Sequence, residues 1–394
     1  MLSTILLDLD DTLLDNQMEQ FIPAYFQRLG EYMSASFPAD KFIRELIVGS
    51  QQMLENTDPR VTLEKAFADY FYPALGITAE DVEEQLYNFY MQDFPSLKPV
   101  TGIRPSARPV VESLLNKGFE VVIATNPLFP KVAIEERLRW ANLAPEELPF
   151  TILTSYETFH FTKPKLAYYA EILGQLGRKA HEVVMVGNDP ELDLDPAQAL
   201  SMRVYHISDD AEGEYPAGNL EDMLQWVDQQ MTIPDPEEKR TPQSITARFR
   251  GHAGALAILT RELTDDEWQR RPASGGWAPV EIICHLRDVE LEVNRSRLDA
   301  FASADLPHLT SHDTDTWSDE QDYFCQSGPE ALEDFLEARA TLLQELEHLD
   351  VEKWDQPARH TLLGPTTLLE VMGISTDHDL LHLGQMRTTI NEIR

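Results

Sequence analysis

Five short apolar runs, each beside a stretch with helical spacing, constrain the fold of this chain most strongly. They are rich in valine and isoleucine and occupy residues 3–9, 119–125, 149–155, 182–188 and 202–208. Continuous apolar strands that alternate with helices are typical of a parallel sheet covered by helices on both faces. Ligands of such sheets bind at the carboxyl ends of the strands. The sequence therefore predicts an α/β parallel-sheet domain with its polar site at that edge.

The pattern changes after residue 232. The segment "TIPDPEEKRTPQ" (232–243) combines three prolines with charge, which is typical of a linker. Beyond it we expect no strands and four long helices, because apolar residues recur with helical spacing over 244–263, 278–303, 329–348 and 365–392. Prolines in "TP", "WAP" and two "GP" pairs mark the helix starts. The sequence predicts two domains, residues 1–232 and 244–394 around a 233–243 linker, the second a separate all-α four-helix bundle.

Charge and cysteine content limit the partners of the chain. Its 68 acidic and 32 basic residues give a net charge of −36, which disfavours nucleic acid as a partner. Two cysteines in 394 residues offer no disulfide framework and fit a reducing compartment. No stretch reaches the length of a membrane span, so we expect a cytoplasmic protein without a membrane partner.

Polar residues follow the strands of the first domain in a recurring order. Asp8, Asp10 and Thr12 follow the first strand, Thr125 and Asn126 the second, and Lys163 lies further along, before Asn188, Asp189 and Asp193. In this order and spacing, the chain over about residues 1–230 resembles the haloacid dehalogenase-like (HAD) superfamily, which has a Rossmann-like core. About ninety residues between the first two strands, 15–100, resemble the helical cap of that superfamily.

The resemblance implies a set of roles. Asp8 would be the nucleophile that forms an aspartyl phosphate, and Asp10 the acid and base. Asp8, the backbone carbonyl of Asp10, and Asp189 would hold Mg²⁺. Thr125, Asn126 and Lys163 would bind the phosphoryl group, with Lys163 also offsetting charge during catalysis. Thr12, Asn188 and Asp193 would support the site. Asn188 departs from the family pattern, since many members have an acid directly after the motif glycine, here Gly187.

Asp10 favours a phosphatase over a haloacid-type dehalogenase, which needs no metal and does not keep an acid two residues after its nucleophile. The implied activity is that of a phosphoric monoester hydrolase acting on a small phosphorylated metabolite. A mononucleotide or a small sugar phosphate would be plausible, and no motif in the predicted cap selects between them.

Histidines supply a second constellation in the predicted bundle. His378 and His382 are four residues apart, so both imidazoles face the same side of one helix and can reach one ion. With His285 in "GGWAPVEIICHLRDVE", they resemble the metal triad of the DinB-like (YfiT-like) four-helix-bundle family over about residues 244–394. Three imidazoles suit zinc, nickel or iron and leave coordination positions open.

Two alternatives stay open. Members of the DinB-like family include metal-dependent thiol S-transferases, so the bundle, with a low-molecular-weight thiol as partner, would carry the main activity. In the other alternative both halves are binding or assembly modules without turnover.

Overall fold

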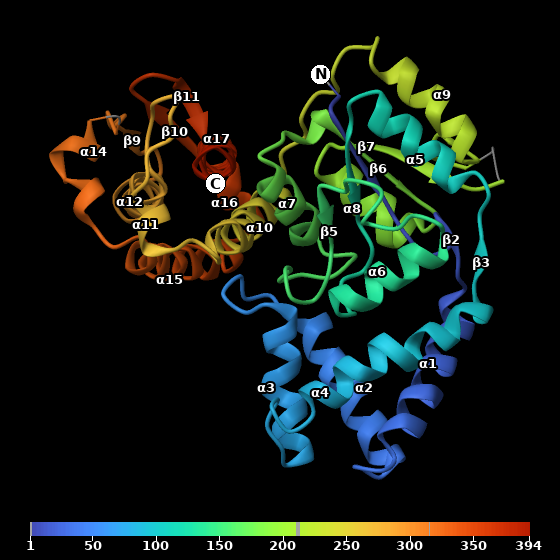
Figure 1. Ribbon diagram of the computed structural model, residues 1–394. Helices are drawn as coiled ribbons and strands as arrows, with labels where there is room; N and C mark the ends of the chain where they lie inside the picture. The colour runs from blue at the N-terminus through green and yellow to red at the C-terminus, as the bar shows by residue number, and fades with distance from the viewer. Residues whose placement is uncertain (1, 210–212, 315) are drawn as a thin grey trace. The chain divides into compact units, whose positions relative to one another are not determined.

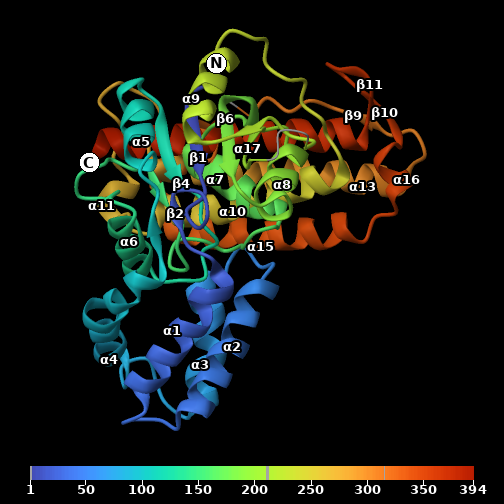
Figure 2. The ribbon, with the colours of Figure 1, turned by 90° about the vertical axis from the view of Figure 1, so that its right-hand side faces the viewer.

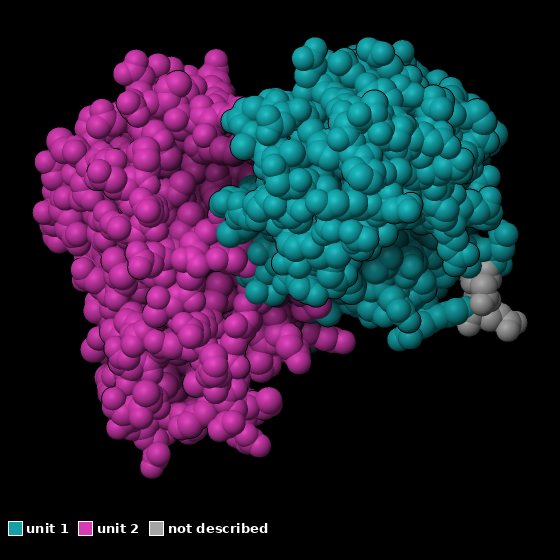
Figure 3. Space-filling view, turned by 90° about the horizontal axis from the view of Figure 1, so that it is seen from below, with its two compact units in different colours: residues 1–57, 61–165, 180–238 teal, residues 58–60, 166–179, 239–394 magenta. Residues whose placement is uncertain are grey.

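The computed structural model describes residues 2–209, 213–314 and 316–394. Its contacts divide the chain into two compact units, coloured separately in Figure 3. Unit 1 comprises residues 1–57, 61–165 and 180–238, and unit 2 comprises residues 58–60, 166–179 and 239–394. Each unit is described by itself below.

A six-stranded sheet forms the centre of unit 1 (Figure 1). Every neighbouring pair is parallel, and β1 (Thr4–Leu7) lies between β4 (Glu120–Ile123) and β6 (Val183–Gly187). The other strands are β5 (Ile152–Leu153), β7 (Arg203–Ile207) and β8 (Ala217–Gly218), in the order β5-β4-β1-β6-β7-β8. The five predicted strands and the predicted α/β parallel-sheet class are confirmed.

Helices accompany this sheet as the alternating pattern predicts. Within unit 1 they are α5 (Ala107–Asn116), α6 (Lys131–Trp140), η3 (Ala180–Glu182), η4 (Pro190–Leu194), α8 (Asp195–Ala199) and α9 (Leu220–Gln230). The apolar side chains of β1 are fully buried between them, as the continuous apolar runs require.

Residues 18–100, between β1 and β4, form a group of helices on one side of the sheet (Figure 2). They are α1 (Met18–Met33), α2 (Ala39–Glu55), α3 (Leu63–Leu75), α4 (Glu83–Asn88), η1 (Phe89–Asp93) and η2 (Phe94–Val100). A two-stranded ladder of β2 (Leu14–Asp15) and β3 (Gly102–Ile103) lies at the two ends of this insertion. We call these helices the cap.

Aromatic side chains hold the cap helices together. In α3, Leu63, Phe67 and Phe71 recur every four residues and are buried on one face. A Cβ added at Gly49 of α2 would lie 2.8 Å from the Phe67 ring, so α2 approaches α3 closely because residue 49 has no side chain.

Unit 2 contains the four helical stretches that the sequence predicts. They are α10 (Pro242–Thr260), the continuous run of α12 (Pro279–Asp288), η5 (Val289–Asn294) and α13 (Arg295–Ser303), then α15 (Gly328–Glu347) and α17 (Leu368–Ile393). Shorter helices are α11 (Asp265–Trp268), α14 (Trp317–Glu320), η6 (Tyr323–Cys325) and α16 (Val351–Trp354). Capping boxes begin α10 at Thr241 and α17 at Thr367.

The expectation that strands are absent after residue 243 is wrong. Unit 2 has a small sheet, β11-β10-β9, made of β9 (His308–Leu309), β10 (Pro357–His360) and β11 (Gly364–Thr367). Pro365, which predicted a helix start, lies in β11, and α17 begins three residues later. Gly364 takes a φ of +76°, which allows the tight turn from β10 into β11.

Helix α7 (Leu166–Leu176) precedes the predicted linker in sequence but groups with unit 2. It packs against α10 through small residues, since a Cβ added at Gly174 would lie 2.7 Å from the Cβ of Ala255. The predicted domain limits, 1–232 and 244–394, stay a prediction. Among the described residues, no helix is both long and apolar enough to cross a membrane.

Candidate functional site

The carboxyl ends of three adjacent strands bring the predicted acidic site together. Asp8 directly follows β1, Thr125 lies two residues after β4, and Asn188 directly follows β6. Because β1 pairs with β4 on one side and with β6 on the other, all three strand ends meet at one edge of the sheet. The order of the parallel strands therefore brings these site residues together.

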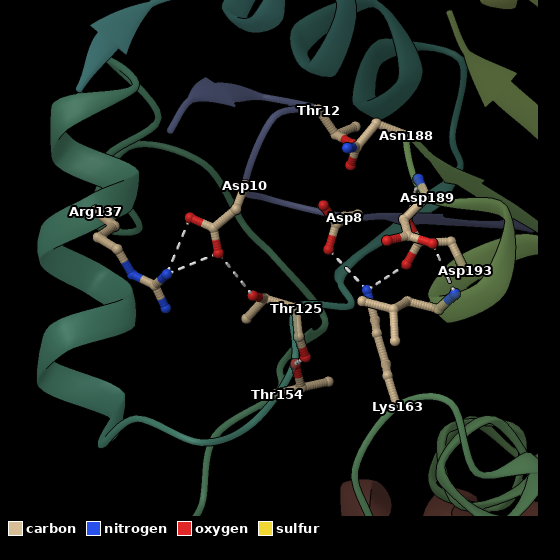
Figure 4. Close-up of polar contacts among 11 residues, drawn as sticks. Asp8, Asp10, Thr12, Thr125, Arg137, Thr154, Lys163, Asn188, Asp189 and Asp193 are labelled. Carbon is tan, nitrogen blue, oxygen red and sulfur yellow. Dashed lines mark hydrogen bonds and ion pairs between the residues drawn. The ribbon is translucent and has the colours of Figure 1, made fainter. Parts of the chain in front are cut away.

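Lys163 joins two buried carboxylates (Figure 4). Its Nζ donates to Oδ1 of Asp8 at 2.7 Å and to Oδ1 of Asp193 at 2.6 Å, and all three residues are buried. Burial raises the pKa of Asp8 to about 7, against the lowering effect of Lys163, while the charges of Asp193 and Asp10 raise it further. Burial likewise raises the pKa of Asp193. One ammonium thus lies between two carboxylates that are costly to ionise.

Asp193 also ties Lys163 to the end of β6. Its Oδ2 accepts from the backbone N–H of Asp189 at 3.2 Å, while Oδ1 accepts from Lys163. A Cβ at Gly187 would overlap the Asp193 carboxylate, which explains why the residue before Asn188 is glycine. Asp193 therefore lies where a supporting residue is predicted.

Asp10 points away from Asp8, toward a different cation (Figure 4). Nη1 of Arg137 donates to its Oδ2 at 2.7 Å and to its Oδ1 at 3.0 Å, and Nδ2 of Asn16 donates to Oδ1 at 2.6 Å. The Thr125 hydroxyl lies 3.4 Å from Oδ2 of Asp10. The two aspartates of the first motif therefore have separate cationic partners.

Sequence reasoning missed Arg137 and Asn16. Arg137 is 1% exposed and lies on the buried face of α6, where Ala133, Ile134 and Leu138 are also buried. Its guanidinium also lies 4.8 Å from the centre of the Phe129 ring. The sequence contains the signal, a single arginine among the apolar residues of this helix face. It does not show which residue the arginine contacts.

The remaining predicted residues line the same edge. The Thr12 hydroxyl donates to Oδ1 of Asn188 at 3.2 Å, and Oδ1 of Asp189 accepts from the backbone N–H of Leu192 at 3.0 Å. Asn126 borders the cavity described next, and its Oδ1 is buried without a hydrogen-bond partner among the described residues. All nine predicted residues of this site thus lie at one edge of the sheet.

A cavity of about 1180 Å³ opens over these residues, between the sheet edge and the cap. Asp8, Asp10 and Lys163 lie at its base, and aromatic side chains of the cap line much of the rest, namely Tyr25, Phe26, Phe42, Phe67, Phe71, Tyr72, Tyr87 and Tyr90. Its acidic cap residues are Glu19, Glu64, Glu80 and Glu83. Among the described lining residues, the basic ones are Lys163 and Arg137, and both are already paired with carboxylates.

The three predicted histidines meet in unit 2. His285 comes from α12, and His378 and His382 come from successive turns of α17. One ligand nitrogen from each lies within 4.8 Å of the others, and Nε2 of His285 lies 3.0 Å from Nε2 of His378. Three imidazole nitrogens thus converge on one point, as a metal site requires.

The surroundings of these imidazoles affect their protonation. Burial, with the neighbouring histidines, lowers the pKa of His285 to about 3, so this imidazole is neutral. Oε1 of Gln385 lies 2.8 Å from Nδ1 of His382. Since an amide oxygen accepts, Nδ1 of His382 is the donor in this contact. Trp277 stacks on the His382 ring at 5.8 Å between centroids.

Two family models match the chain. The haloacid dehalogenase-like hydrolase model matches residues 2–200, and the DinB superfamily model matches residues 248–386. No curated protein matches the sequence.

Solved structures resemble each part. A HAD phosphatase from Thermococcus onnurineus is 17% identical, with a TM-score of 0.38, covering 57% of this chain and 98% of its own. A 2-haloacid dehalogenase from Pseudomonas syringae pv. Tomato DC3000 is 20% identical, with a TM-score of 0.41, covering 58% and 99%. The four-helix-bundle protein YfiT from Bacillus subtilis is 16% identical, with a TM-score of 0.36, covering 41% and 93%.

The parallel sheet and the carboxylates at its edge agree with the first family model, which matches half of the sequence. The helices and the three histidines of unit 2 agree with the second family model. The chain belongs to the haloacid dehalogenase-like hydrolase family, and it carries in addition a DinB-like domain.

Proposed function

We propose that unit 1 is a Mg²⁺-dependent phosphatase that hydrolyses a small phosphorylated metabolite through an aspartyl phosphate on Asp8. The observation that supports it best is the separate placement of two carboxylates at the base of one cavity. Asp8 contacts Lys163, whereas Asp10 contacts Arg137 and Asn16. Two acids in different surroundings can take different roles in one reaction.

In this proposal Asp8 attacks phosphorus, and Asp10 protonates the leaving oxygen and later activates water. Lys163 offsets the negative charge that Asp8 and the phosphoryl group bring together. Thr125 and Asn126 hold phosphoryl oxygens from the end of β4. Arg137 and Asn16 fix the orientation of Asp10 while no substrate is bound.

The donor set fits a hard divalent cation. Lys163 binds Oδ1 of Asp8, which leaves Oδ2 as a ligand, and the raised pKa of Asp8 means that a cation beside it would stabilise the charged form. The Asp10 carbonyl and Asp189 complete the set we propose. When bound, Mg²⁺ neutralises the phosphate charge and stabilises the transition state.

Asp10 also distinguishes this proposal from dehalogenation. A dehalogenase has no oxygen leaving group to protonate, so it has no use for an acid here.

The cavity suggests the kind of leaving group. Its aromatic lining favours an apolar or aromatic alcohol, and its glutamates disfavour a second negative charge. We therefore propose a monophosphate ester of a neutral or cationic alcohol that carries an aromatic group, which favours a nucleoside-like group over a sugar bisphosphate or a phosphorylated carboxylic acid.

The test is phosphate release by the full chain from phenyl phosphate and from phosphoglycolate, with Mg²⁺ or with EDTA. We expect Mg²⁺-dependent release that prefers phenyl phosphate and falls at least ~10³-fold in Asp8→Asn. Asp15→Asn is the matched control, because Asp15 is exposed in β2 and is not among the residues that line the cavity. Halide release from 2-chloropropionate without phosphate release would reject the phosphatase.

For unit 2 we propose a divalent transition metal on His285, His378 and His382. Three protein ligands leave positions for a substrate, and a cavity reaches His378, so thiol transfer is the second candidate function. In the same set of assays, we would measure the consumption of a thiol in the presence of an electrophile. Consumption that persists in Asp8→Asn and is lost in His285→Ala would assign the main activity to the bundle.

A further inference from the structure

A second cavity, of about 270 Å³, lies within unit 2 beside the histidine triad. Its walls are largely apolar and include Val289 and Val293 of η5 and Val371 of α17. His378 lines it as well, so the cavity extends to one of the three converging imidazoles. The cavity is of a size for a small molecule.

Arg297 of α13 brings a positive charge to this apolar cavity. Its Nη1 donates to the Ser375 hydroxyl at 2.9 Å, and its buried Nε has no hydrogen-bond partner among the described residues. Burial lowers the pKa of Arg297, and no carboxylate of the described residues raises it. The buried Arg339 in the same unit differs, since it pairs with Glu290 and Asp379.

Among the described residues no carboxylate pairs with Arg297, although the chain has 68 acidic residues and a net charge of −36. A partly buried guanidinium without a counter-ion is unfavourable unless something compensates its charge. A bound anion would supply that compensation, and one with two oxygens matches the fork of N–H donors on arginine.

His360 lines the same cavity. It is buried, and its Nδ1 accepts from the backbone N–H groups of Leu362 at 3.2 Å and Leu363 at 3.3 Å. Since Nδ1 accepts, the proton of the neutral ring lies on Nε2. That Nε2 is buried without a hydrogen-bond partner among the described residues.

We propose that this cavity binds a small aliphatic carboxylate, with its charged end on Arg297 and His360 and its carbon chain against the valines beside His378. A neutral ligand would leave the Arg297 charge uncompensated, and a cationic one would be repelled. A nucleotide is too large and polar for these walls. The site is independent of the chemistry proposed for unit 1.

The test is a ligand-observed NMR titration of the full chain with butyrate and with its neutral isostere butyramide, as purified and after EDTA treatment. We expect butyrate to bind at least about tenfold more tightly than butyramide under both conditions. Arg297→Gln should abolish this preference, and Arg297→Lys should restore part of it.

Two further variants separate the donors from the fold. His360→Asn keeps an acceptor for the two backbone N–H groups but removes the Nε2 donor, so butyrate affinity should fall several-fold. Arg295→Gln is the control, because Arg295 lies on the same helix and pairs with Glu345 instead. Equal affinity for butyramide, binding that vanishes with EDTA and ignores Arg297→Gln, or tighter binding of inorganic phosphate would each overturn the proposal.

Discussion

The acidic site of unit 1 and the histidine site of unit 2 solve the burial of polar groups in opposite ways. At the sheet edge, buried carboxylates keep protein cations beside them, Lys163 for Asp8 and Arg137 for Asp10. At the triad, three imidazoles converge and His285 is neutral. In the first site the chain supplies the compensating charges, whereas the second places one nitrogen of each imidazole within 4.8 Å of the others.

Because one site has charged side chains and the other has neutral ones, the two sites require different surroundings. Buried carboxylates need an opposite charge beside them even before a substrate or metal binds, because burying an uncompensated charge is costly. Neutral ligands need only be held in position. The acidic site therefore depends on residues from several elements, and the histidine site depends on two helices and one amide.

The largest effect should follow removal of one imidazole. His285→Ala leaves two ligands on α17, and we expect affinity for Zn²⁺ or Ni²⁺ to fall by on the order of 10³-fold. Metal titration followed by elemental analysis of the full chain measures this. His348→Ala is the control, because His348 is exposed at the end of α15. Unchanged metal affinity in His285→Ala would mean that His285 does not bind the metal together with the two histidines of α17.

The second prediction concerns the charge of Asp8. Its folded pKa of about 7 lies above the ordinary value of 3.8, so the folded state binds the proton more tightly and stability from this group is lost as pH rises through 7. Asp8→Asn removes the buried charge while Lys163 keeps Asp193 as its partner. In EDTA at pH 8, the variant should unfold with a free energy roughly 1 to 3 kcal/mol higher than wild type.

The same comparison near pH 4 serves as the control, since Asp8 is protonated in folded wild type there and the gain should shrink. Denaturant unfolding of unit 1 at both pH values measures it. A variant that is less stable than wild type at pH 8 would mean that the Asp8–Lys163 contact outweighs the burial of the charge.

The smallest effect should come from the amide beside the triad. Gln385→Ala removes the acceptor that fixes the His382 tautomer, and we expect metal affinity to fall about tenfold. Gln385→Glu should restore the affinity, because a carboxylate also accepts from Nδ1. If Gln385→Ala binds metal as tightly as wild type, packing against Trp277 alone positions His382.

Local sequence determined a large part of this protein. Apolar runs of the right length became β1, β4, β5, β6 and β7, and residues that directly follow these strands, such as Asp8 and Asn188, lie at one sheet edge. The four-residue spacing of His378 and His382 placed them on one helical face. These features depend on neighbours within a few residues, which is why they can be read from the sequence.

Only the tertiary structure decided which distant side chains complete each site. Arg137 meets Asp10 across 127 positions and Asn16 meets it across six, while Arg297 and His360 converge on one cavity from separate elements. The β9–β11 sheet and the grouping of α7 with unit 2 likewise depend on contacts between segments far apart in the chain. A hydrophobic pattern specifies the face that a side chain occupies, but its partner is set by the packing of the elements, which no single segment encodes.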